Sequence, residues 1–469
     1  MQDQNKKIEK KLKLTFASGA TTVTGANFIL ETMPDEGSSE EKVYVMVDCG
    51  LVQGDADPRE NMKPFVYDPS KIDYLLITHA HIDHIGRIPK FVKDGFKGKI
   101  FSTIETKELT PIMLKDAAKL MLQEAEKTGN PPIYFEADID DAMKLWKDVP
   151  YHESFKLSGG FDVEAKDAGH ILGSAMYEIT YNGTKIVFTG DLGNSPSPLL
   201  RDTEKIIDAN YLIMESVYGD RNHETNQERK EKLEDVIEDS VKRGGTLIIP
   251  SFSLEKTQNL LFEMNTLVDG KRIPDVPVFL DSPLAMKVTD IYMKEKKNFN
   301  ADALLRIKEG EDLFSFPKLR IVRSAEESRE LIKEPSPKII IAGSGMSTGG
   351  RILHHEVNYL PDPQSTILLT GYQSFGTLGR QISNHPKMVS IFGSKIHVNA
   401  HIESIDGYSS HKDSDHLLEF VGFTRDSLKK VFPVMGEPRS SMFLAQKIED
   451  YLGVETYHPE DGESVVLSC

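Results

Sequence analysis

One short stretch of the chain is dense in side chains that bind metals: His79, His81, Asp83 and His84 lie within residues 79–84. They directly follow the apolar run 74–78, which predicts a strand that ends in a turn. Such a turn directs several side chains into one small volume. Zinc takes imidazole and carboxylate ligands in compact, mostly four-coordinate sites. The spacing therefore predicts a site for a pair of zinc ions, and a solvated polar loop is the much weaker alternative.

Two further ligands are available later in the chain. His170 lies between glycines in the stretch 168–174, where the backbone can approach a crowded centre. Asp191 comes just after the predicted strand 185–189, where a carboxylate is placed to bridge two ions. Alone, either residue is more often structural. In this order after the His-x-His-x-Asp-His turn, both are predicted to be ligands.

Composition sets broad limits on the class of protein. With 469 residues the chain has room for two or three domains, and its 39% hydrophobic and 28% charged content is typical of a soluble globular protein. No membrane span and no secretory signal are expected, and two cysteines exclude a disulfide framework, so we predict a cytoplasmic protein. The net charge of −17 counts against a broad basic surface for nucleic acid but leaves a local positive cleft open.

The pattern of apolar runs predicts an α/β protein. Strands are expected at 12–16, 27–31, 42–47, 161–165, 175–181 and 185–189, with a helix over 107–126. From about residue 216, near-continuous apolar strands alternate with helices, which predicts a doubly wound, mostly parallel sheet in a domain of its own. Its strands are expected at 245–250, 278–281, 319–322, 338–342 and 366–370, and its helices at 228–242 and 254–267. After about residue 405 a helix from Ser414 and strands at 430–434 and 464–467 return to the first part.

Taken in order, these residues resemble the metallo-β-lactamase superfamily. Asp48, at the end of an early strand, matches the first motif of that family. The resemblance implies an αββα sandwich with its metal ions at one edge of the sheets. It further implies that one zinc is held by His79, His81 and His170, the other by Asp83 and His84, with Asp191 bridging and Asp48 orienting a ligand or the bridging water.

Five further stretches resemble the β-CASP branch of that superfamily, whose members are nucleases. They are Glu-Ser-Val-Tyr-Gly at 215–219, Pro-Ser-Phe-Ser at 250–253, Asp-Ser-Pro-Leu-Ala at 281–285, the Gly-rich stretch 343–351, and Ser-Ser-His-Lys-Asp at 409–413. This implies a first lactamase segment at residues 1–215, an inserted doubly wound β-CASP domain at 216–404, and completion of the lactamase domain by 405–469.

The chemistry that the resemblance implies is hydrolysis of a phosphodiester by a metal-bound hydroxide. The leaving 3′-oxygen then needs a proton, and His411 held by Glu215 is the predicted general acid. The catalytic set is therefore Asp83, Asp191, Glu215 and His411. The amides of loop 343–350 could cradle a phosphate, a tight turn with a helix cap being the alternative. The candidate substrate-binding residues are Ser344, Gly345, Met346, Arg351 and Tyr372.

The chain departs from the family at the third lactamase motif. Residues 434–437 read Val-Met-Gly-Glu, where the family usually has His-Gly-Glu, and that histidine completes the second zinc site. A thioether is a poor zinc ligand beside carboxylate and imidazole. We therefore expect one to two zinc ions per chain, with the second site weakened by Met435.

Together these features predict a zinc-dependent ribonuclease that cleaves single-stranded RNA. The alternatives are a DNA nuclease of the same fold, since relatives acting on DNA also lack this histidine, and a catalytically weak RNA-binding scaffold. A small-molecule hydrolase would give the inserted domain no purpose. No membrane partner is expected. Monomer or homodimer, and endonuclease or exonuclease, stay open.

Overall fold

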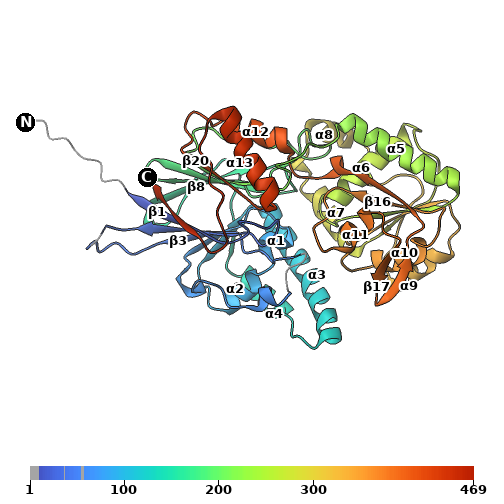
Figure 1. Cartoon of the computed structure of the whole chain (residues 1–469), viewed down its shortest axis with the longest axis horizontal. Helices are drawn as coiled ribbons and strands as arrows, with labels where there is room; N and C mark the ends of the chain where they lie inside the picture. Colours follow the sequence, from blue (N-terminus) through green and yellow to red (C-terminus); the bar gives the residue numbers. More distant parts are fainter. Residues whose placement is uncertain (1–9, 36, 54–57) are drawn as a thin grey trace, which may run out of the picture. The chain divides into compact units, whose positions relative to one another are not determined.

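A computed structural model describes residues 10–35, 37–53 and 58–469. The start of the chain, where the absence of a secretory signal was predicted, lies outside the described residues up to residue 9. The chain divides into two compact units. The first comprises the described residues up to Gly193 together with Thr203–Arg221 and His411–Cys469, and the second comprises Asn194–Asp202 and Asn222–Ser410. The first unit thus joins the blue, green and red parts of the chain in Figure 1.

Within the described residues, the first unit contains two β-sheets. The seven-stranded sheet has the order β21-β1-β2-β3-β4-β5-β6, and the six-stranded sheet has the order β20-β11-β10-β9-β8-β7. The first consists of β1 (Lys11–Ser18), β2 (Asn27–Met33), β3 (Tyr44–Val47), β4 (Tyr74–Leu76), β5 (Lys99–Ser102), β6 (Trp146–Asp148) and β21 (Ser464–Ser468). The second consists of β7 (Phe155–Lys156), β8 (Phe161–Asp167), β9 (Ala175–Tyr181), β10 (Thr184–Phe188), β11 (Tyr211–Glu215) and β20 (Lys430–Val434).

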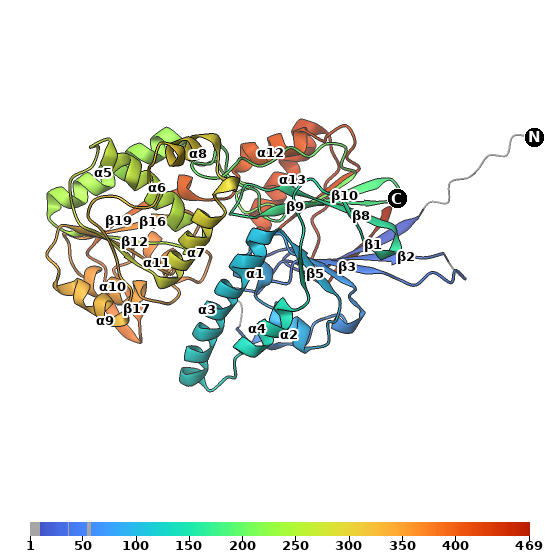
Figure 2. The same cartoon turned by 180° about the vertical axis from the view of Figure 1, so that it is seen from behind.

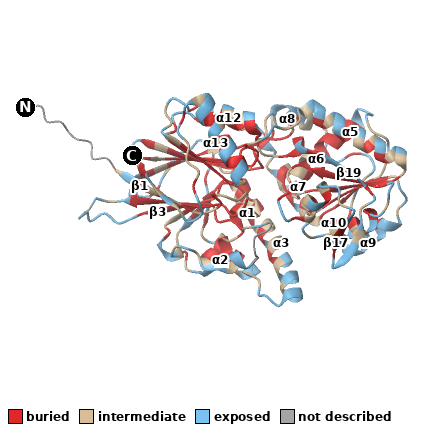
Figure 3. Cartoon of the chain, in the orientation of Figure 1, coloured by how far each residue is buried: buried red, intermediate tan, exposed pale blue. Residues whose placement is uncertain are grey.

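Apolar side chains join the two sheets face to face. The rings of Phe28 and Phe188 lie 6.2 Å apart, and those of Phe16 and Phe432 lie 5.5 Å apart, each pair linking one sheet to the other. One buried cluster takes in side chains of both inner faces. Figure 3 shows these strands as mostly buried, while the outward faces of the surrounding helices are exposed. The inner faces therefore form the core of a β-sandwich.

Helices cover both outer faces of this sandwich. On the six-stranded side, α12 (Ser414–Gly422) and α13 (Pro438–Leu452) pack against β11 and β20 through Leu417, Phe420, Leu444 and Ile448. In Figures 1 and 2 the other helices lie beyond the seven-stranded sheet. They are α1 (Ile82–Ile85), α2 (Ile88–Lys93), α3 (Ile104–Thr128) and α4 (Glu136–Met143). The layer order is the αββα sandwich that the sequence predicted.

The second unit is built on a parallel sheet, as predicted. In the described part of this unit the order is β14-β13-β15-β12-β16-β19, with every neighbouring pair parallel. The strands are β12 (Thr246–Pro250), β13 (Val278–Asp281), β14 (Leu319–Ile321), β15 (Lys338–Ala342), β16 (Thr366–Thr370) and β19 (His401–Ile405), with a separate hairpin of β17 (Met388–Ile391) and β18 (Ser394–His397).

Helices lie on both faces of this parallel sheet, so it is doubly wound. In Figure 2, α5 (Asn226–Arg243) and α6 (Lys256–Asp269) lie on one side, and α10 (Ile352–Tyr359) and α11 (Leu378–Ser383) lie on the other. The remaining helices of the unit are α7 (Pro283–Lys294), α8 (Ala301–Lys308) and α9 (Ala325–Glu330). None of the helices in the described part of the chain has both the length and the apolar content needed to cross a bilayer.

Candidate metal centre and proton donor

The predicted metal ligands lie where strands of the first unit end. His79 and His81 follow β4, with Asp83 and His84 in the short helix α1, while Asp191 follows β10. Gly190, next to Asp191, has a φ of +52°, and a Cβ there would lie 2.6 Å from Cβ of Thr78. Only glycine allows this approach, which brings the loop after β10 onto the loop after β4.

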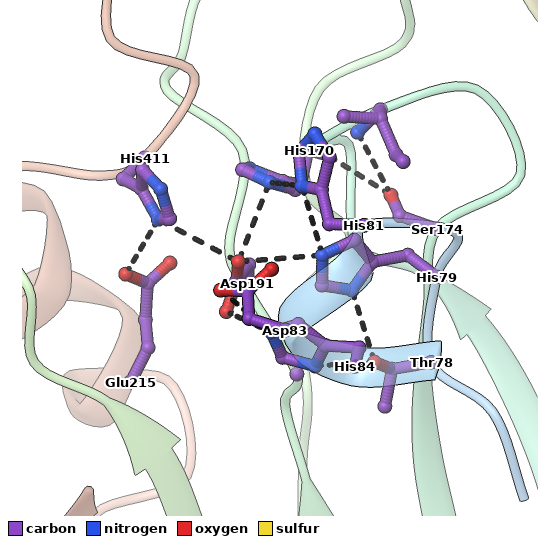
Figure 4. Close-up of polar contacts among 12 residues, drawn as sticks. Thr78, His79, His81, Asp83, His84, His170, Ser174, Asp191, Glu215 and His411 are labelled. Atoms are coloured by element: carbon purple, nitrogen blue, oxygen red, sulfur yellow. Dashed lines mark hydrogen bonds and ion pairs between the residues drawn. The ribbon is translucent and has the colours of Figure 1, made fainter. Parts of the chain in front are cut away.

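Four ligand atoms converge at the first candidate metal position (Figure 4). His81 Nδ1 lies 3.1 Å from His79 Nε2 and 3.2 Å from His170 Nε2. Asp191 Oδ2 lies 3.3 Å from His79 Nε2 and 3.4 Å from His170 Nε2. Ligands placed tetrahedrally about 2.1 Å from a zinc ion lie about 3.4 Å from one another. The observed separations therefore fit one ion held by this set.

A second candidate position lies on the other side of Asp191. His84 Nε2 and Asp191 Oδ1 are 3.3 Å apart, and His84 Nε2 is 3.9 Å from Asp83 Oδ2. Both His84 Nε2 and Asp191 Oδ1 are buried without a hydrogen-bond partner. Buried polar atoms normally have partners, and a shared cation would supply one. The donor set of Asp83, His84 and Asp191 thus fits a second ion with three protein ligands.

Asp48 and Thr78 form hydrogen bonds with Nδ1 of His84 and His79, on the ring side away from the candidate ions. Asp48 Oδ2 accepts hydrogen bonds from Thr78 Oγ1 (2.7 Å) and from His84 Nδ1 (2.7 Å), and Asp48 Oδ1 accepts from the Thr78 amide (2.8 Å). Because the Thr78 hydroxyl donates to Asp48, its oxygen is left to accept from His79 Nδ1, 3.0 Å away. Both histidines therefore direct Nε2, the nitrogen that can bind a metal once it carries no proton, toward the candidate ions.

The surroundings set the charge of these groups. Burial lowers the pKa of His79 and His170, so both are neutral, which is the form that binds a metal. Burial acts in the same direction on His84, but the carboxylates of Asp191 and Asp48 raise its pKa well above the usual value. Metal binding at His84 therefore releases a proton.

The predicted proton donor lies beside this cluster. His411 Nδ1 is 2.9 Å from Glu215 Oε2 and 3.9 Å from Asp191 Oδ2. The other carboxylate oxygen of Glu215 accepts from the amide of Leu192. Glu215 is fully buried at the end of β11, and burial raises its pKa. The hydrogen bond with Glu215 therefore orients the His411 imidazole, whose ring lies 4.6 Å from that of His170.

Met435 occupies the position where a histidine was expected from the family pattern. It directly follows β20, its amide donates to Gly19 O (2.8 Å), and its side chain belongs to the apolar core between the sheets. With Asp48, His84 and Glu215 it lines a cavity about the size of one water molecule. A thioether therefore replaces an imidazole next to His84.

The predicted phosphate loop follows β15 in the second unit. The hydroxyl of Ser344 accepts from the amide of Thr348 (2.9 Å). A Cβ on Gly345 would lie 2.3 Å from the ring of Phe252, so this residue must be glycine. Met346 is partly buried in the same loop. These contacts order the loop, and phosphate binding by it stays a prediction.

Arg351 and Tyr372 also lie in the second unit. Arg351 Nη1 forms an ion pair with the buried Asp281 (2.6 Å), whose other oxygen lies 2.7 Å from His355 Nε2. The guanidinium therefore already has an anionic partner within the protein, which favours an anchoring role for Arg351. Tyr372 follows β16 and is partly buried.

Sequence reasoning missed two residues that position ligands. Thr78 precedes the histidine turn and contacts Asp48 and His79 as described above. Ser174 accepts from the amide of His170 (3.0 Å) and so shapes the turn that carries that ligand. A single hydroxyl residue beside a motif does not form a recognisable sequence pattern, so these contacts could be found only from the structure.

The comparisons with known proteins agree with this geometry. Family models match residues 39–267 (Metallo-beta-lactamase superfamily), 257–382 (Beta-Casp domain) and 395–459 (Zn-dependent metallo-hydrolase RNA specificity domain). The chain is 34% identical over 377 residues to a ribonuclease of Thermus thermophilus, covering 80% of this chain and 85% of that protein. It is 29% identical over 426 residues to RNase aCSPSF2 of Saccharolobus solfataricus (90% and 80% covered).

Two further matches extend over nearly the whole chain. Transcription termination factor FttA of Methanosarcina mazei is 28% identical over 472 residues, covering 97% of this chain and 72% of that protein. A solved structure of a protein of unknown function from Enterococcus faecalis shares the fold, with a TM-score of 0.53 at 13% identity and coverage of 97% and 100%.

Fold, site and matches together define a metal-dependent hydrolase of the metallo-β-lactamase superfamily. Within that superfamily, the chain belongs to the β-CASP metallo-hydrolases.

Proposed function

We propose that this β-CASP hydrolase is a zinc-dependent ribonuclease that cleaves single-stranded RNA. The observation that carries the proposal is the contact of His411 with Glu215 (2.9 Å), with His411 3.9 Å from Asp191, which supports a proton-donating role for His411 beside the candidate metal ligands. The names of relatives, a ribonuclease among them, and the match to an RNA specificity domain at residues 395–459 support RNA as the substrate.

Each residue has a role in this proposal. Zinc ions held by the two sets of ligands would supply Lewis acidity and activate water for attack on the phosphodiester. His411 donates a proton from Nε2 to the leaving 3′-oxygen, while Glu215 holds Nδ1 and stabilises the protonated ring. Asp48 and Thr78 keep His84 and His79 in the tautomers that leave Nε2 for the metal. His79, His170 and Asp191 are buried, so only a flexible single strand could bring a phosphate to them.

The decisive assay uses single-stranded RNA and DNA of the same sequence, labelled at the 5′ end or internally. We expect cleavage of RNA that stops with a chelator and returns with added zinc or manganese. Label position separates internal cuts from removal of end nucleotides. Preferential cleavage of DNA would overturn the RNA assignment, and binding of RNA without cleavage at any metal concentration would favour the scaffold function.

Met435 is the observation that keeps the DNA nuclease and the scaffold as second candidates. Because it lines the same cavity as His84, Met435→His is expected to add a ligand at the second position. The gain in affinity for the second ion should be at least about tenfold, or about 1.4 kcal/mol. Chelator competition that follows release of the second ion measures it, beside RNA cleavage at limiting zinc.

Met442→His is the matched control, because Met442 is 56% exposed on α13. It should change neither metal binding nor cleavage. Unchanged metal binding in Met435→His would show that the thioether does not limit the second site. Tighter binding without cleavage of either nucleic acid would favour the scaffold.

A further inference from the structure

A buried ion pair of the second unit lies against the segment that leads to His411. Arg229 of α5 and Glu263 of α6 pair through Arg229 Nη2 and Glu263 Oε1, with side chains only 4% and 1% exposed. Arg229 Nη1 also donates to the carbonyl of Gly407 (3.1 Å), and the hydroxyl of Tyr408 donates to the second oxygen of Glu263. The pair therefore also forms hydrogen bonds with Gly407 and Tyr408.

Two further contacts hold the same two residues. Glu224 Oε2 accepts from the amide of Gly407 (2.6 Å), and the guanidinium carbon of Arg229 lies 5.0 Å from the centre of the Tyr408 ring. Burial raises the pKa of Tyr408 well above its usual value, so the hydroxyl keeps the proton that it donates. Four side chains thereby fix the backbone three residues before His411.

Hydrogen bonds to the backbone hold the residues between Tyr408 and His411. The amide of Ser409 donates to Asp406 O (2.8 Å), and its carbonyl accepts from Asn194 Nδ2 (3.2 Å). The carbonyl of Ser410 accepts from the Asn194 amide (2.9 Å). His411 itself forms an antiparallel bridge with Gly193. These contacts hold the second unit's backbone up to Ser410, the residue directly before His411.

We propose that Arg229, Glu263 and Tyr408 are positioning residues for the general acid, because they clamp the segment that carries His411. This inference rests on the proposed role of His411. A buried charge pair of this kind is costly to desolvate and contributes little net stability, whereas removal of one partner leaves the other charge without compensation. Its contacts are made with the 3-10 turn Asp406–Tyr408 that leads to His411, which gives the pair a role in positioning that residue.

The test separates proton donation from other losses by changing the leaving group. RNA cleavage needs a proton on the leaving oxygen, whereas bis(4-nitrophenyl) phosphate releases a weakly basic phenolate that leaves without one. We expect Tyr408→Phe and Glu263→Gln to lower kcat for RNA by about 10- to 100-fold, with KM, zinc content and ester hydrolysis within twofold of wild type. The ratio of RNA to ester rates therefore falls, as it does in His411→Ala.

Arg272→Met is the matched control. Arg272 pairs with Glu234 of α5 through two bonds (2.6 and 3.0 Å), so this variant removes another Arg–Glu pair of the same unit without touching residues 406–411. It should leave the ratio unchanged. If Glu263→Gln does not fold, Tyr408→Phe decides, because it keeps the ring and loses only the hydroxyl.

The outcomes distinguish this inference from the function on which it rests. If His411→Ala lowers the ratio but Tyr408→Phe and Glu263→Gln leave it at the wild-type value, the positioning role is wrong and the general acid stands. If His411→Ala leaves the ratio unchanged, His411 is not the proton donor, and both proposals fail.

Discussion

Asp191→Ala is expected to lose most of the bound metal and to lower strand cleavage at least about 10³-fold, because one carboxylate serves both candidate ions. Its Oδ2 lies 3.3 Å from His79 Nε2, and its Oδ1 lies 3.3 Å from His84 Nε2. Without it, the first position keeps three imidazoles, and the second keeps only Asp83 and His84. Elemental analysis of the purified variant and a cleavage assay with excess zinc measure the two effects.

Two further variants sharpen this result. Asp83→Ala should lose the second ion and, with it, activity. It should keep the first ion, which is held by His79, His81, His170 and Asp191. Asp141→Ala removes a carboxylate that is 61% exposed on α4 and should behave as wild type. If Asp191→Ala kept near-normal metal content and activity, the shared-ligand arrangement would be wrong.

His411→Ala is expected to cut RNA cleavage by about 10²- to 10⁴-fold, the range typical of losing a general acid. Metal content should stay close to that of wild type, because His411 contacts Glu215 rather than completing either set of ligands. Single-turnover cleavage rates and elemental analysis on the same preparation check both statements.

His416→Ala is the control for this variant. His416 is 41% exposed on α12, five residues further along, and pairs only locally with Asp413 (2.7 Å). It should cleave at the wild-type rate. Cleavage by His411→Ala at that rate would remove His411 from the mechanism.

The cluster of candidate metal ligands could be predicted because most of them are close together in the chain. His79, His81, Asp83 and His84 share one turn, and the apolar run before them identifies the strand that carries it. His170 and Asp191 follow in an order that a family pattern makes specific. The parallel sheet of the second unit was equally clear, since strands buried on both faces give long apolar runs such as β12 and β15.

Contacts made by tertiary packing have no comparable local signal in the sequence. Arg229 lies in α5, whose sequence is charged along its whole length, so nothing local distinguishes a buried arginine from its exposed neighbours. The pairing of Arg351 with Asp281 spans 70 residues and gives an anionic partner within the protein to a guanidinium that the sequence suggested for phosphate. Likewise, the segment Asn194–Asp202 belongs to the second unit, and its amino-acid composition does not indicate this.

The way in which the first unit is assembled has a consequence for its synthesis. All six candidate ligands precede residue 192, but β20, which pairs with β11, and β21, which pairs with β1, follow the second unit in the chain. His411 likewise follows the second unit. During synthesis, all six candidate ligands are therefore present long before His411 and the strands that complete the two sheets of the sandwich.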